Sequence, residues 1–152
     1  MLKKIAASVA TITLIVTPAY ASPSNTTNAQ VTDSATPKNY TLNGELILIT
    51  SRGLAGGSEC RGQDGFDDIY GGQQVLVKNG KGEVIAVGSL GAGAREQQYP
   101  QVACHLPITV DNVPDSDFYQ IEIGSGRRGS STYSKKDLEE KGWSVNLTLS
   151  SI

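Results

Sequence analysis

Apolar and polar residues alternate in several segments of the chain from residue 40 onward. The pattern covers 106–110, 119–123 and 143–149, and Trp143 opens the last of these segments. A period of two places successive side chains on opposite faces of a strand, so each segment is predicted to be a half-buried β-strand. Trp143 shares a face with Val145 and is therefore expected to be a buried anchor.

Three more strands are predicted in the first half of this region. The run 40–50 is apolar at every position from 46 to 49, which favours a central strand. Strands at 75–77 and 83–87 flank a turn that contains Asn-Gly, a pair that accepts the positive φ of tight hairpins.

One short helix is predicted near the C-terminus. Ser134 is placed to cap it, Asp137 falls at the third helical position, Leu138 supplies an apolar contact and Gly142 ends it. A helix of two turns needs docking to be stable. Six strands and this helix predict a mainly β fold, an antiparallel two-sheet sandwich. Parallel pairing is not expected, because parallel neighbours need a crossover helix and only one helix is predicted.

The N-terminal region has the pattern of an export signal. Two lysines precede an apolar run at 5–16, and Ala19-Tyr20-Ala21 is a small-x-small cleavage motif. Residues 1–21 are therefore predicted to be a secretory signal peptide. The apolar run is shorter than the ~20 residues that span a bilayer. We expect a secreted or periplasmic protein with no membrane span after cleavage.

Residues 22–39 are rich in Ser, Thr, Asn and Ala, and predict a flexible linker. One folded domain is then expected at 40–152, which suits a chain of 152 residues. Removal of residues 1–21 takes away two lysines and no acid, so 11 basic and 15 acidic residues remain. The resulting negative charge argues against nucleic acid as a partner. We expect a monomer.

Cys60 and Cys104 are the only cysteines. In an exported chain, two cysteines form a disulfide by default. The alternatives are a reactive thiol or half of a metal site, and a chain with one histidine offers little for zinc. A cross-link over this separation would contribute about 4 kcal/mol in the chain-entropy model.

Two loops carry candidate binding residues. The segment 52–72 is long for a connection, which favours a functional loop, and it gathers Asp64, Asp67 and Asp68. These carboxylates offer oxygen ligands for calcium, or they form a turn in which Asp accepts hydrogen bonds from backbone amides. A second loop holds Arg127 and Arg128, which could contact an anion or an acidic partner.

Catalytic patterns are weak. Three glycines at 124, 126 and 129 match a dinucleotide fingerprint, but the predicted helix begins well beyond them. His105 directly follows Cys104, and neighbours in a strand point to opposite faces. Because no nucleophile and base are paired, we expect no enzyme and no cofactor other than calcium.

Two series of motif positions run through most of the domain: Val75, Val77, Asn79, Gly82, Val84, Ile85, Ala86, Leu106, Ile108, Val113, Pro114, Tyr119, Ile121 and Ile123 in the first, and 65–69, 119–124, 133–134 and 142–143 in the second. On the first series the domain resembles the prealbumin-like (transthyretin-like) sandwich domains of secreted proteins. On the second, 60–149 is also similar to uncharacterised exported bacterial proteins. The chain departs from the prealbumin-like pattern by the insertion at 52–72 and by Cys104, where a Gly-aromatic pair is usual. The resemblance implies an exported binding or accessory module rather than an enzyme, with a protein, a cell-wall component or an ion as partner. A small secreted hydrolase or a calcium-binding domain is the alternative.

Overall fold

A computed structural model describes residues 37–151 of the chain. The predicted signal peptide (1–21) and most of the predicted linker (22–36) lie outside the described residues. The described part is mainly β with one short helix, as predicted, and none of its helices is long and apolar enough to cross a membrane. Its elements are β1 (Asn39–Thr50), β2 (Gln74–Asn79), β3 (Val84–Leu90), β4 (Ala94–Gln98), β5 (Gln101–Pro114), β6 (Phe118–Ile123), β7 (Ser130–Ser134), α1 (Lys135–Glu140) and β8 (Ser144–Ser151).

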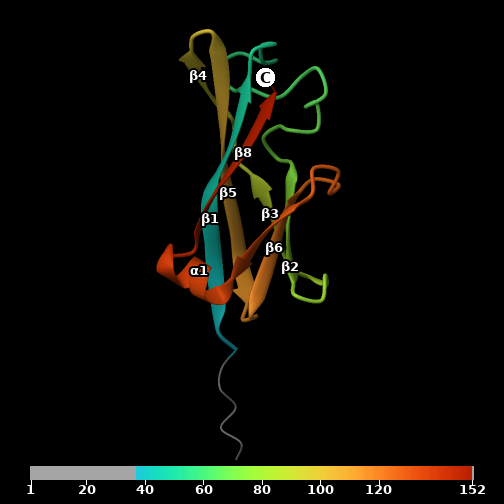
Figure 1. The fold of residues 1–152 in the computed structure, drawn as a ribbon, viewed down its shortest axis with the longest axis vertical. Helices are drawn as coiled ribbons and strands as arrows, with labels where there is room; N and C mark the ends of the chain where they lie inside the picture. The colour runs from blue at the N-terminus through green and yellow to red at the C-terminus, as the bar shows by residue number, and fades with distance from the viewer. Residues whose placement is uncertain (1–36, 152) are drawn as a thin grey trace, which may run out of the picture. The chain divides into compact units, whose positions relative to one another are not determined.

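The eight strands form one hydrogen-bonded sheet (Figure 1). Its order is β7-β6-β2-β3-β5-β1-β8, and β4 also pairs with β5. The ladders differ greatly in length: β1 and β5 share eleven residue pairs, whereas β3 and β5 share only Ser89–Thr109 and Leu90–Ile108. The sheet is therefore held together at its middle by a short ladder.

The expectation of purely antiparallel pairing is wrong for one pair of strands. β1 and β8 are parallel, from Asn43–Ser144 to Thr50–Ser151. The crossover rule applies to parallel strands that follow each other in the chain, and here six strands and α1 form the connection. β1 has a neighbour on each side, which confirms its predicted central position.

The six-strand prediction missed β4 and β7. Their sequences, Ala-Arg-Glu-Gln-Gln and Ser-Ser-Thr-Tyr-Ser, contain no alternation of apolar residues. β4 pairs only with β5 and β7 only with β6, so each lies at an edge where its polar side chains can stay solvated. Pairing with a neighbour, and not local propensity, makes these segments strands.

The core lies on the inner faces of the strands. Tyr119 is fully buried, and its hydroxyl donates to the Pro114 carbonyl (3.2 Å) and accepts from the Ser116 amide (2.7 Å). Burial raises the pKa of this phenol. The large fully buried side chains include Leu42, Leu46, Leu48, Ile69, Leu90, Leu106, Ile108, Ile121 and Leu138.

The predicted helix signals are present at both ends of α1. Ser134 Oγ accepts from the Asp137 amide, and the Asp137 carboxylate accepts from the Ser134 amide, both at 3.1 Å. A hydrogen bond from the Ser134 hydroxyl to the Asp137 carboxylate (2.6 Å), with the bond from the Ser134 amide, lowers the pKa of Asp137. At the other end Gly142 has φ +61°, and the Trp143 amide donates to the Leu138 carbonyl at 2.7 Å. This arrangement is a Schellman motif, which ends the helix and turns the chain into β8.

Trp143 is less buried than the alternation predicts. Its ring packs against the core but remains half-exposed, and its φ is +59°. It stacks on Tyr40 (ring centroids 3.7 Å apart) and meets Tyr119 edge-on (5.3 Å). The residue belongs to the helix-terminating turn as much as to the strand, and this explains the difference.

Candidate functional site

The disulfide between Cys60 and Cys104 is present, as predicted. Both cysteines are buried, and their Cα atoms lie 5.8 Å apart. A Cβ on Gly93 would lie 2.8 Å from Cys104 Sγ and 2.4 Å from the Cys60 carbonyl oxygen, so only glycine fits beside the bridge. The bridge ties the centre of the loop 52–72 to β5 and indicates an oxidising compartment.

Arg95 of β4 provides a second attachment for this loop. Its Nη2 donates to the carbonyl oxygens of Leu54 (2.9 Å) and Gly56 (3.0 Å). The loop also forms an isolated bridge with the start of β4, between Glu59 and Ala94. Leu54 is buried and its carbonyl needs a donor, so this guanidinium satisfies the loop backbone while it attaches the loop to β4.

Arg128 provides a third attachment. Its Nε donates to Asp68 Oδ2 at 3.1 Å, and its Nη2 donates to Asp68 Oδ1 and to the Gly65 carbonyl oxygen (2.6 Å). The guanidinium also lies over the Phe66 ring, 4.5 Å from its centroid. The hydrogen bond from Arg128 holds the pKa of Asp68 below its usual value. The two loops that were separate candidates in the sequence therefore form one site.

The acidic residues of the loop have different surroundings. Asp67 accepts a hydrogen bond from the Gly65 amide (3.2 Å), two residues before it, so its carboxylate takes part in the turn. Asp64 is exposed, with φ +52°, and Asp68 is engaged by Arg128. Among the described residues no three His, Cys, Asp or Glu side chains are placed to hold a metal ion. The calcium hypothesis stays a prediction.

The surface beside this turn is a shallow hollow of about 560 Å³. It is lined by Gly65, Asp67, Asp68, Arg127 and Arg128. Arg127 is exposed and makes no ion pair with another described residue, although its charge also lowers the pKa of Asp68. The hollow thus presents carboxylates and a guanidinium to solvent within a few residues of each other.

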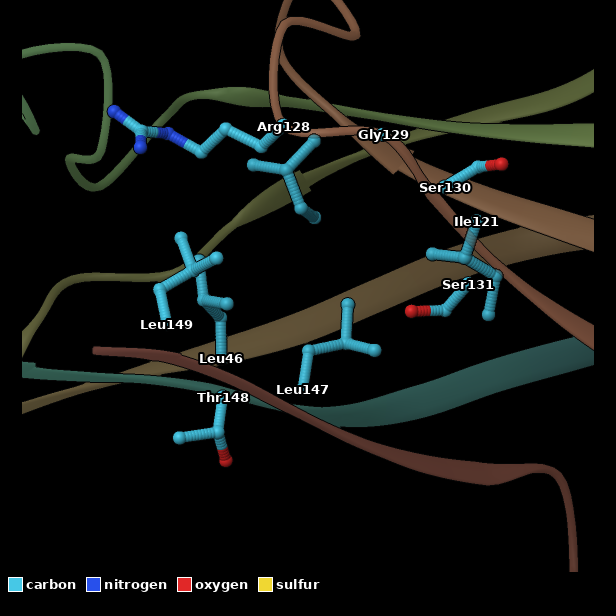
Figure 2. A pocket seen from close by; sticks show the side chains of 10 residues that line it. Leu46, Ile121, Arg128, Gly129, Ser130, Ser131, Leu147, Thr148 and Leu149 are labelled. Atoms are coloured by element: carbon cyan, nitrogen blue, oxygen red, sulfur yellow. The ribbon is translucent and has the colours of Figure 1, made fainter. Parts of the chain in front are cut away.

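A cleft separates β7 from β8, and we call it the β7–β8 seam. It is lined by 128–131 and 147–149, with Leu46 and Ile121 beneath, and its volume is about 160 Å³ (Figure 2). Leu147 and Leu149 point into the cleft, whereas Thr148 points away from it. Sequence reasoning missed this feature, because the two leucines have the same alternating pattern as any core-facing residue.

The residues examined for catalysis lie elsewhere. His105 is placed between two carboxylates: Nδ1 is 3.2 Å from Glu45 Oε1, and Nε2 is 2.9 Å from Glu96 Oε2. Cys104 is in the disulfide and offers no thiol. The three glycines at 124, 126 and 129 adopt positive φ and lead into β7 rather than into a helix. The expected dinucleotide context is therefore absent from this part of the described chain.

Comparisons with known proteins add no assignment. No protein-family model, no curated protein and no solved structure matches this chain. The function must therefore be inferred from the geometry of the two surfaces, the anchored loop 52–72 and the β7–β8 seam.

Proposed function

We propose that the protein is an exported, non-catalytic binding or accessory module that contacts its partner through the exposed tip of the loop 52–72. One observation carries this proposal: a long loop is attached to the sheet at three points, while Asp64 and Asp67 at its tip face solvent. A loop that is ordered before binding loses little conformational entropy when a partner arrives. Loops held by a rigid scaffold are also where binding residues concentrate.

The exposed groups define the chemistry of the partner. Asp64 and Asp67 offer carboxylate oxygens, Arg127 offers a guanidinium beside them, and Tyr70 is 43% exposed on the same loop. A basic segment of a protein, with an acidic or polar residue next to it, would satisfy all of these groups. A cell-wall component or an ion would engage only part of this surface, so we favour a protein.

Location and fold class are part of the proposal. The export signal and the disulfide together favour a secreted or periplasmic protein. A prealbumin-like sandwich is favoured by the two-pair ladder between β3 and β5, which divides the sheet into a β7-β6-β2-β3 leaf and a β5-β1-β8 leaf. We propose a monomer that needs no cofactor.

The test removes the negative charges of Asp64 and Asp67 and keeps the hydrogen bond between Asp67 and the Gly65 amide. Asp64→Asn with Asp67→Asn keeps an acceptor for the Gly65 amide and leaves the Arg128–Asp68 pair intact. Wild type and variant are immobilised and exposed to the extracellular or periplasmic fraction of the producing cells. Proteins held by wild type should be lost from the variant at an unchanged melting temperature.

The matched control is Asp117→Asn. Asp117 is an exposed carboxylate directly before β6, whereas the Arg127–Arg128 loop follows β6. It should retain the same proteins as wild type. Equal retention by the Asp64/Asp67 variant would refute the proposed surface.

A calcium-binding domain is the alternative that shares these residues. Calcium needs several oxygen ligands, and both Asp68 oxygens already accept hydrogen bonds from Arg128. Calcium bound through Asp68 would therefore compete with Arg128 for this carboxylate. Calorimetric titration with calcium decides this alternative, since no heat at millimolar calcium rejects it. The hydrolase alternative gains no support from His105, whose ring lies against two glutamates.

A further inference from the structure

The seam is bounded by two strand edges that have no partner strand in the described chain. β7 pairs only with β6, and β8 pairs only with β1. Each edge therefore presents backbone N–H and C=O groups that no described strand pairs. Such an edge is a template for an added strand.

Neither edge carries the usual protection against strand addition. Natural edge strands are commonly blunted by charged side chains or by proline. The sequences of β7 and β8 contain no Lys, Arg, Asp, Glu or Pro, whereas the edge strand β4 carries Arg95 and Glu96. The seam is thus the place in the described sheet where two unprotected edges border one cleft.

The lining of the seam suits the side chains of an extended peptide. Leu147 and Leu149, which are partly exposed, form its apolar surface, and the buried Leu46 and Ile121 lie beneath them. In a strand every second side chain points to one face, so alternate residues of an added strand would cover these groups. Burial of apolar area would then accompany the backbone hydrogen bonds.

The charged residues that line the seam and the adjoining hollow are cations, and one of them, Arg128, is already paired with Asp68. Arg128 lines one end, and Lys141 lines a second hollow at the α1 end together with Tyr133, Ser144 and Asn146. No Asp or Glu lines either hollow. Arg128 uses Nε and Nη2 to hold the loop, so its Nη1 donors are available to a ligand. An acidic residue at each end of the peptide would complement these cations.

From these observations we propose that the β7–β8 seam binds an extended peptide segment of a partner protein, with alternating apolar residues and acidic ends, which pairs with the free edge of β8. This surface is distinct from the exposed tip of the loop 52–72. The partner segment is recognised by its backbone, by its alternation and by its charge.

The experiment uses labelled synthetic peptides and the folded protein. The probe is fluorescein-labelled Asp-Val-Thr-Val-Thr-Val-Asp, followed by fluorescence anisotropy. Two controls replace both Asp by Lys, or the central Val by Pro, which cannot donate a ladder hydrogen bond. Saturable binding of the acidic peptide, weaker binding of both controls, and slower amide exchange along β8 are expected.

A pair of variants with opposite charge tests the site. Ser130 is exposed and lines the seam. Ser130→Asp should weaken binding of the acidic peptide several-fold, and Ser130→Lys should preserve or strengthen it. The Asp64→Asn/Asp67→Asn variant should bind the peptide as wild type does, which separates this proposal from the loop proposal.

Four outcomes would overturn the proposal. These are no saturable binding at millimolar acidic peptide, equal affinity for either control peptide, and equal effects of the two Ser130 variants. The fourth is protection of β8 amides in a dimer without added peptide, which would assign the seam to a second copy of the chain.

Discussion

The loop 52–72 is attached to the rest of the domain at more points than the two strands of the β7–β8 seam are attached to each other. The loop has no regular structure, yet a disulfide, Arg95 and Arg128 attach it to β5, β4 and the β6–β7 turn. The seam is made of regular strands, yet no ladder connects β7 with β8. In these two regions, the contacts that join one segment to another determine how firmly a segment is held, and the presence of regular secondary structure does not.

This difference separates two ways to make a binding surface. The loop presents side chains whose positions are set in advance, so it can recognise a partner of fixed shape. The seam presents backbone groups and an apolar lining, so it can accept any segment that becomes a strand. Substitutions that detach the loop should therefore change binding at the loop tip, and substitutions in the seam should change peptide binding there.

The largest effect is expected from the disulfide. Cys60→Ala with Cys104→Ala removes a cross-link between residues 44 positions apart and should lower the free energy of unfolding by about 4 kcal/mol. Urea denaturation followed by the fluorescence of Trp143 measures it. Reduced wild type is the control and should unfold at a similar urea concentration. An unchanged midpoint in both samples would show that the loop does not depend on this bridge.

Trp143 lies between α1 and β8 and stacks on Tyr40. Trp143→Ala removes the stack on Tyr40 and should cost about 2–3 kcal/mol, less than for a fully buried tryptophan. Thermal melting by circular dichroism measures the loss. Trp143→Phe keeps an aromatic ring against Tyr40 and should cost less. Equal losses in the two variants would contradict the importance of the stack.

Arg128 and Arg127 are adjacent but differ in their contacts. Arg128→Ala removes the bonds to Asp68 and Gly65 and should cost about 1–2 kcal/mol, whereas Arg127→Ala should stay within about 0.5 kcal/mol. Limited trypsin digestion should also cleave faster after Arg61 in the Arg128 variant alone. Similar digestion of both variants would mean that Arg128 does not hold the loop.

The smallest effect is a dependence on pH. The pKa of Asp68 is lowered in the folded protein, so its pairing with Arg128 stabilises the fold above the unfolded pKa and is lost as pH falls through the folded one. The stability difference between wild type and Arg128→Ala should therefore shrink below about pH 4. Denaturation at several pH values measures it. Asp115 and Asp137 also have lowered pKa values, but both proteins share them, so their contributions cancel. A constant difference would indicate that Asp68 is not the partner.

The predictable parts of the fold are those determined by neighbours in the chain. Alternation identified three strands, and an apolar run and the segments flanking an Asn-Gly turn identified three more. Ser134, Asp137 and Gly142 identified the helix because capping is local. The disulfide was predictable because only two cysteines exist.

The parts that sequence reasoning missed depend on distant contacts. β4 and β7 are strands because β5 and β6 lie beside them, and their own residues carry no alternating signal. Nothing in the sequence connects Arg128 with Asp68, 60 positions away, so the two halves of the candidate site looked independent. The seam was missed because a cleft between two edges is a property of strand order.

The parallel pairing of β1 and β8 has a mechanical consequence. β1 enters the sheet at Asn39 and β8 leaves it at Ser151, so the two points lie at opposite ends of the β1–β8 ladder (Figure 1). A force that pulls these points apart slides one strand along the other and loads the hydrogen bonds from Asn43–Ser144 to Thr50–Ser151 together. An antiparallel pair pulled from one end would open bond by bond. Mechanical unfolding from these two points should therefore begin with the whole β1–β8 ladder under shear.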